Sequence, residues 1–276
     1  MTFRLSGFAD EISPDPAEQL AVLAAESISY LELRSVWGTN VADLSDAQLA
    51  EFLALLDDAG VSVSSIGSPI GKIPIEAPFK PELDRMRRIA EVASRCGTSI
   101  VRVFSFFMPA GTPPELHRPQ VIDRLAALAA IAGQHGLTLA HENEKLIYGD
   151  VPQRCADIIT TVESPALQAT FDAANFVQCG VRPHTDGYDL LRPYLVYVQV
   201  KDALAATGQV VLAGEGDGEV RDTLSALVED DFDGFLSLEP HLATAGQFGG
   251  TSGPEGFRRA AHALKDLLTD LSASWE

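Results

Sequence analysis

The sequence predicts an α/β protein, a single (β/α)8 barrel that spans residues 1–276. Its length of 276 residues is close to the roughly 250 residues that are usual for this fold. Short runs rich in β-branched and aromatic residues alternate with longer amphipathic stretches along the whole chain. The short runs are nearly apolar throughout, as parallel strands buried on both faces are. No linker interrupts the alternation, so we expect one domain; a doubly wound open sheet is the alternative.

Eight strand–helix units follow one another in this pattern. The expected strands cover residues 3–8, 30–34, 61–66, 99–106, 137–142, 167–172, 194–201 and 235–239. The expected helices cover residues 16–26, 44–59, 81–96, 119–135, 152–162, 188–192, 219–229 and 256–271. The pattern of a helix is clearest at residues 44–59. Leu49, Phe52 and Leu56 recur there at helical spacing, and Gly60 follows as a residue that ends helices. The sixth helix is expected to be short.

Composition limits the classes of function. The chain has 20 Lys and Arg against 39 Asp and Glu, a formal net charge of −19. Such a surface repels nucleic acid and anionic membranes, so neither is expected as a partner. Three widely spaced cysteines indicate a reducing compartment rather than disulfides or a thiolate zinc site. Without a signal-peptide pattern or an apolar run of about 18 residues, we expect a cytoplasmic protein. A homo-oligomer is left open.

The last four expected strands each end in a side chain with a ligand oxygen. These side chains are Glu142, Asp172, Gln199 and Glu239, separated by 30, 27 and 40 residues, or about one barrel unit each. Chemistry in such barrels lies at the carboxyl ends of the strands, so the four should point into one mouth. Three carboxylates that close repel one another unless a cation neutralises them. The pattern predicts either a hard divalent metal ion or a set of strand-end salt bridges.

At these residues the chain resembles the xylose isomerase-like TIM-barrel superfamily, the sugar phosphate isomerase/epimerase group. The likeness covers the segments at residues 7–12, 65–72 and 237–242 and extends over nearly the whole chain. It implies one divalent metal ion held by Glu142, Asp172, Gln199 and Glu239. The third ligand in the family is usually His; Gln199 matches the hydroxypyruvate isomerase branch. An oxygen ligand there favours Mn²⁺ or Mg²⁺, with Co²⁺ or Zn²⁺ as alternatives.

The resemblance also implies a reaction on a small-molecule carbohydrate. A metal-stabilised enediolate would form when a proton leaves the carbon beside a carbonyl group. Glu142 and Glu239 match the two glutamates that exchange this proton in the epimerases. Substrate contacts are expected from residues at the other strand ends, namely Lys201, His241, Asn175, Arg102, Lys72 and Glu144. For Lys201 and His241 the alternative role is ion pairing with Asp202 and Glu239.

Two other reactions are known on this scaffold. A lyase or dehydratase acting on an inosose or a 3-keto-sugar would begin with the same proton abstraction, so the residues do not separate it from an isomerase. AP endonucleases share the fold but need a histidine-rich zinc cluster and a basic groove. With six histidines, few of them at strand ends, and a charge of −19, the chain does not fit that reaction.

Three further features receive structural or minor roles. Arg34 and Arg102 are expected to pair with Glu32 and Glu11 inside the mouth. The loop before Lys72 has glycines but no phosphate-loop pattern. The glycine-rich segment at residues 214–218 is predicted to be a flexible lid.

Overall fold

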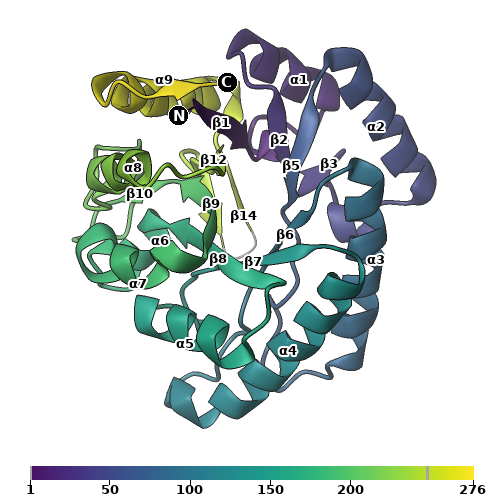
Figure 1. The fold of residues 1–276 in the computed structure, drawn as a ribbon. Coiled ribbons are helices and arrows are strands. Elements are labelled where there is room, and N and C mark those ends of the chain that lie inside the picture. The colour runs from purple at the N-terminus through teal and green to yellow at the C-terminus, as the bar shows by residue number, and fades with distance from the viewer. Residues whose placement is uncertain (1, 247–248) are drawn as a thin grey trace.

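The structure is a computed structural model that describes residues 2–246 and 249–276. Within these residues, eight parallel strands form the barrel wall, and their helices lie outside it (Figure 1). The wall strands are β1 (Thr2–Gly7), β2 (Tyr30–Leu33), β5 (Ser62–Ile66), β6 (Ile100–Val103), β7 (Thr138–Glu142), β8 (Leu167–Asp172), β9 (Leu195–Val200) and β12 (Phe235–Leu238). Their hydrogen-bonded order is β1-β12-β9-β8-β7-β6-β5-β2. The (β/α)8 prediction is confirmed.

The barrel closes between its first two strands. All neighbouring wall strands pair in parallel, and β1 lies beside β12 with Gly7 opposite Leu238. On its other side β1 meets β2 through a single parallel bridge between Phe8 and Glu32. A short C-terminal strand, β15 (Ser274–Trp275), pairs with the start of β1. This last strand was not predicted from the sequence.

The helices form the outer layer. They are α1 (Pro16–Ala25), α2 (Asp46–Ala59), α3 (Lys80–Cys96), α4 (Arg118–Gln134), α5 (Pro152–Val162), α6 (Ala173–Gln178), α7 (Asp189–Leu191), α8 (Val220–Glu229) and α9 (Gly253–Asp270). Local signals explain their ends. Ser45 and Gln48 form a capping box at the start of α2, and Gly60 ends it at φ 66°. The short sixth unit is a π-helical turn at Pro183–Tyr188 followed by α7.

Two apolar regions hold the layers together. The larger one fills the space between the sheet and the helices and includes Leu139 of β7. A smaller one lies inside the barrel and contains Ala140, Tyr197 and Phe235. Because side chains alternate along a strand, Ala140 and Glu142 share the inner side of β7 while Leu139 faces the helices. This alternation directs the last residue of β7 into the mouth.

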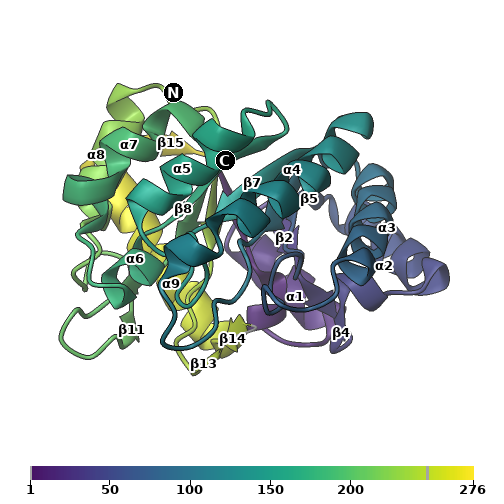
Figure 2. The same ribbon diagram turned by 90° about the horizontal axis from the view of Figure 1, so that it is seen from below.

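Short hairpins gather at the end of the barrel where the wall strands finish (Figure 2). They are β3 (Ser35–Val36) with β4 (Thr39–Asn40), β10 (Asp202–Ala203) with β11 (Val210–Val211), and β13 (Thr244–Gly246) with β14 (Gly249–Thr251). The fourth wall strand is shorter than predicted. Beyond Val103 the backbone bonds the loop after β5, with the Phe104 amide donating to the carbonyl oxygen of Ile70. None of the described helices has the length and apolarity needed to cross a membrane.

Candidate active site

Three predicted ligands meet at the mouth of the barrel. Glu142 ends β7, Asp172 ends β8, and Glu239 directly follows β12. One carboxylate oxygen of each lies within 4.8 Å of the others, and all three side chains are buried. This is a spacing at which a single ion can contact all three. The structure therefore brings together residues that are 30 to 97 positions apart in the chain.

Gln199 completes the predicted set. It lies on β9, in register with Asp172 on one neighbouring strand and with Ser237 on the other. The side chain is 1% exposed, and neither its amide oxygen nor its amide nitrogen has a hydrogen-bond partner among the described residues. A buried amide without partners is costly, so this one is suited to a ligand.

Lys201 is the cation closest to this set. Its Nζ lies 2.8 Å from Asp172 Oδ2 and 2.7 Å from Glu239 Oε2, and all three groups are buried. The alternative pairing of Lys201 with Asp202 is wrong. Asp202 instead accepts backbone hydrogen bonds from Gly214 and from the loop beyond it. Lys201 is therefore part of the mouth.

Arg102 bridges the two glutamates predicted to exchange the proton. Its Nη1 lies 3.2 Å from Glu142 Oε2 and 3.6 Å from Glu239 Oε1. The guanidinium carbon lies 4.8 Å from the ring centroid of Phe8 and 4.9 Å from that of Phe104. The expected pairing with Glu11 is not found, since Arg102 is held by the site carboxylates.

The site carboxyl groups differ in acidity when no metal is bound. Burial raises the pKa of Glu142 to about 8, although Arg102 opposes it. Burial also raises the pKa of Asp172 to about 6, against the effect of Lys201. For Glu239 burial acts in the same direction, but Lys201 and other cations outweigh it and hold its pKa well below the usual range.

Two asparagines fix the first two carboxylates. Asn175 Nδ2 donates to Glu142 Oε1 at 3.1 Å, and the Asn175 backbone amide donates to Asp172 Oδ1 at 2.9 Å, which caps α6. Asn143 exchanges two hydrogen bonds with the backbone of Asp172. Asn175 was predicted to bind substrate, and in the structure its side-chain amide lies in the mouth and donates to Glu142.

Lys72 and Glu144 form a pair on the rim of the mouth. Lys72 Nζ lies 3.4 Å from Glu144 Oε2 and 4.2 Å from the ring centroid of Phe104. Glu144 also contacts Lys145, which is 3.3 Å away. Both predicted rim residues therefore lie together, on the loops after β5 and β7.

The glycine-rich segment is not a free lid. Asp202 accepts backbone hydrogen bonds from Ala203, Gly214, Gly216 and Gly218 at 2.8, 2.9, 3.0 and 2.8 Å. A Cβ atom on Gly216 would lie 2.4 Å from Asp202 Oδ1, so glycine is needed there. The prediction of a flexible lid is wrong, because one buried carboxylate ties the segment to β10.

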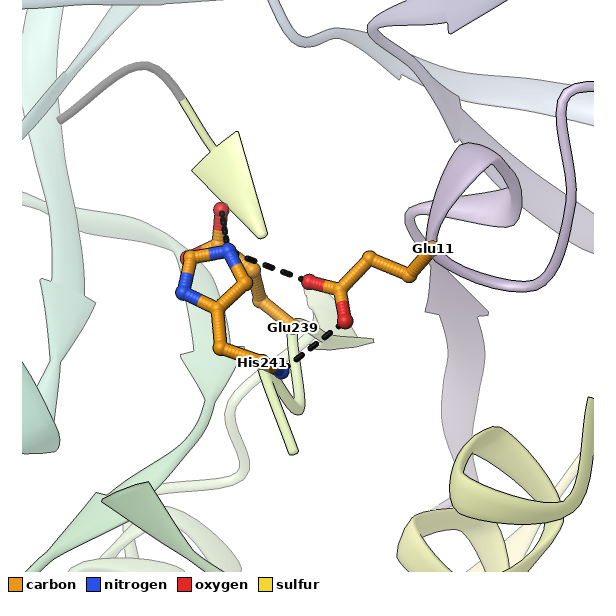
Figure 3. Close-up of side chains that lie close together, drawn as sticks. All are labelled: Glu11, Glu239 and His241. Atoms are coloured by element: carbon orange, nitrogen blue, oxygen red, sulfur yellow. Dashed lines mark hydrogen bonds and ion pairs between the residues drawn. The ribbon is translucent and has the colours of Figure 1, made fainter. Parts of the chain in front are cut away.

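A second group of polar residues lies beside Glu239. His241 was predicted to bind substrate, whereas Glu11 and Arg34 were expected only to form ion pairs inside the mouth. Glu11, in the turn after β1, contacts His241 and lies opposite Glu239 (Figure 3). Arg34 joins this group, with Nη1 3.1 Å from Glu239 Oε1 and Nε 2.8 Å from Asp10 Oδ2. Its Nη2 lies 4.0 Å from Glu11 Oε1. In the sequence, the adjacent acidic residues Asp10 and Glu11 directly after the first apolar strand could have indicated this group.

Comparison with known proteins agrees with the fold. A curated 2-epi-5-epi-valiolone 7-phosphate 2-epimerase from Actinoplanes sp. is 27% identical over 233 residues, which cover 82% of this chain and 83% of that protein. The solved structure of a D-tagatose 3-epimerase-like protein superposes with a TM-score of 0.80 at 16% identity and covers 98% of both chains.

A xylose isomerase-like TIM barrel protein from Mycobacterium smegmatis, solved in complex with magnesium, has a TM-score of 0.69 at 20% identity. It covers 99% of this chain and 98% of its own. The sequence model of one family, described as "Xylose isomerase-like TIM barrel", matches residues 20–267. The match spans most of the barrel, from α1 to α9, and the chain belongs to the xylose isomerase-like TIM barrel family.

Proposed function

We propose that this protein is a divalent-metal-dependent isomerase or epimerase that acts on a sugar or a sugar derivative. The observation that carries the proposal is the convergence of Glu142, Asp172 and Glu239 beside the unpartnered amide of Gln199. Epimerases are named among its relatives, which supports the same reaction class. The three cysteines in the structure are unpaired, which agrees with a cytoplasmic enzyme.

The donor set fits a hard divalent ion. Three carboxylates and one amide offer oxygen ligands only, which suits Mn²⁺ or Mg²⁺ better than Zn²⁺ or Co²⁺. Structural neighbours have been solved with magnesium and with zinc, which supports a divalent ion of either kind. When bound, such an ion would polarise the carbonyl group and the neighbouring hydroxyl oxygen of a sugar, which acidifies the carbon–hydrogen bond between them.

We assign the proton exchange to Glu142 and Glu239. They stand on β7 and directly after β12, with β8 and β9 between those strands. A substrate bound over Asp172 and Gln199 would therefore present one face of its reacting carbon to each glutamate. One glutamate removes the proton and the other returns it from the opposite side, which inverts the carbon.

The cations of the mouth would act on oxygen atoms. Lys201 and Arg102 hold Glu239 from different sides, and each has further hydrogen atoms to donate to a substrate oxygen. Lys72 and Glu144 on the rim offer a donor and an acceptor for more distant hydroxyl groups. His241, which lies beside Glu239, would likewise form a hydrogen bond with a hydroxyl group of the substrate.

The test is deuterium wash-in from D₂O at saturating Mn²⁺ or Mg²⁺, followed by NMR. The panel contains ketohexoses, their phosphates, inososes and 3-keto-glycosides. We expect wash-in at the carbon beside the carbonyl with the wild type and a loss of about 10²–10⁴-fold in rate with Glu142→Gln and with Glu239→Gln. Glu91→Gln, which changes an exposed carboxylate on α3, is the matched control.

The products decide between the reaction classes. An epimer or isomer with deuterium at one carbon supports the proposal. Loss of water from the substrate would assign the dehydratase reaction instead. Wash-in that survives both glutamine substitutions at saturating metal would contradict the two-glutamate mechanism, and the absence of wash-in over the whole panel would contradict the function.

A further inference from the structure

The carboxyl group of Glu11 makes three polar contacts, two of them with His241, although the two residues are 230 positions apart. Glu11 Oε2 accepts a hydrogen bond from the His241 backbone amide at 2.8 Å and one from the Ser252 hydroxyl at 2.8 Å. Its other oxygen, Oε1, lies 3.1 Å from His241 Nε2 (Figure 3). Glu11 is 1% exposed, so these contacts are made away from water.

His241 needs such support because its position is strained. Its backbone has a φ of 45°, in the left-handed region that residues other than glycine rarely adopt. The neighbouring hairpin approaches the imidazole so closely that a Cβ atom on Gly250 would lie 2.2 Å from His241 Cδ2. The ring is thereby pressed against the mouth, with Nε2 3.5 Å from Glu239 Oε1.

The cluster of Glu11, Glu239 and His241 is better explained by positioning than by a second metal ion. Arg34 already supplies a cation there, with Nη1 3.1 Å from Glu239 Oε1 and Nη2 4.0 Å from Glu11 Oε1. A divalent ion between the same oxygens would meet the guanidinium charge at close range. The other ring nitrogen of His241, Nδ1, lies on the side of the ring away from Glu11 (Figure 3).

We propose that Glu11 is a positioning residue that fixes the backbone and ring of His241, so that Nδ1 forms a hydrogen bond with a hydroxyl group of the substrate. The inference rests on the proposed function for the substrate contact, and on geometry alone for the positioning. It joins the first and last units of the barrel at the mouth. Glu11 acts on substrate binding only through His241.

The first test needs no substrate. Hydrogen–deuterium exchange of the segment at residues 239–243 is compared in the wild type, Glu11→Ala and Glu11→Gln. The alanine removes the acceptor of the His241 amide, and losing a hydrogen bond of this kind should speed its exchange about tenfold. The glutamine keeps an acceptor oxygen for His241 and Ser252, so exchange should stay within about twofold of the wild type.

The matched control is Glu26→Ala. Glu26 is another buried glutamate that contacts a histidine, with Oε2 3.1 Å from His262 Nε2, but it lies between α1 and α9 on the outside of the barrel. Its substitution should leave exchange at residues 239–243 unchanged. Unchanged exchange in Glu11→Ala, or equal acceleration by alanine and glutamine, would overturn the positioning role even if the enzyme is an epimerase.

The second test uses whichever substrate shows wash-in. Glu11→Ala and His241→Ala should each raise KM about tenfold with kcat nearly unchanged, as expected for one lost substrate hydrogen bond. The double variant should be no worse than His241→Ala, because Glu11 acts through that residue, and Glu11→Gln should restore KM. Additive effects, or a loss in kcat alone, would overturn the inference. No wash-in by the wild type would refute the proposed function and leave the exchange test to decide the positioning.

Discussion

Lys201 Nζ lies 2.7 Å from Glu239 Oε2 in the buried mouth of the barrel. An ammonium group thus contacts one of the carboxylates that would hold the proposed metal ion. The same ammonium contacts Asp172 Oδ2 at 2.8 Å. Lys201 compensates part of the charge of the carboxylate cluster, and it would compete with a bound metal ion for Asp172 and Glu239.

Replacing Lys201 with Met should therefore separate its compensation of the carboxylate charge from its competition with the metal ion. Removing one partner of a buried ion pair leaves unpaired carboxylates and typically costs about 3–5 kcal/mol, so the metal-free variant should unfold at lower urea concentration. Added Mn²⁺ should stabilise the variant more than the wild type. Lys145→Met, at the exposed rim, is the control. Equal stabilisation of wild type and Lys201→Met by Mn²⁺ would show that the ammonium and the ion do not share ligands.

The affinity of the site for a metal ion should rise with pH. In the absence of metal the pKa of Asp172 is about 6 and that of Glu142 about 8, in both cases mainly through burial. An ion must displace these protons, so its affinity should rise as pH increases from 6 to 8. At an Mn²⁺ concentration 100 times Kd at pH 8, the free energy of unfolding should increase by about 2.7 kcal/mol. Thermal denaturation with and without chelator measures this, and a stabilisation that does not change with pH would contradict the carboxylate ligand set.

Glu32 should make the protein less stable at high pH. Burial raises its pKa to about 7 from 4.5, although Arg102 opposes the shift. The folded state therefore holds a proton between pH 4.5 and 7 that the unfolded state has lost, and stability falls as pH rises through this window, by up to about 3 kcal/mol. Glu32→Gln keeps an acceptor for Ser237 and should flatten the profile. Urea denaturation at pH 5 and pH 8 tests this, with Glu51→Gln as the exposed control; parallel profiles for Glu32→Gln and wild type would refute it.

Asp202 should order the loop at residues 212–219. Asp202→Asn places an amide NH₂ against backbone N–H donors such as those of Gly214 and Gly218. A loss of about 2–3 kcal/mol is expected from the unsatisfied groups, together with faster hydrogen exchange in the loop. Asp217→Asn, an exposed change in the same loop, should have a small effect on both quantities. Slow exchange that persists in Asp202→Asn would mean that other contacts hold the loop.

The sequence by itself determined the barrel and the positions of the proposed ligands. Apolar strands alternating with amphipathic helices leave few arrangements other than a parallel barrel, and its strand ends meet on one face. The proposed ligands, which are Glu142, Asp172, Gln199 and Glu239, could be found because each lies at or next to the carboxyl end of such a strand. Helix ends could also be predicted from the local sequence, because glycines such as Gly60 mark them.

Only the tertiary structure decided which charges meet. Lys201 follows Gln199 by two residues and shares its inward direction, whereas Asp202 turns outward to the loop amides, so the pair of adjacent charges is split between two environments. The contact of Glu11 with His241 depends on the parallel pairing of β1 with β12, which brings the turn after β1 beside the loop after β12. Local sequence patterns carry strand direction and burial, but they do not encode the distances between side chains on distant strands. Those distances arise from register and packing across the whole sheet.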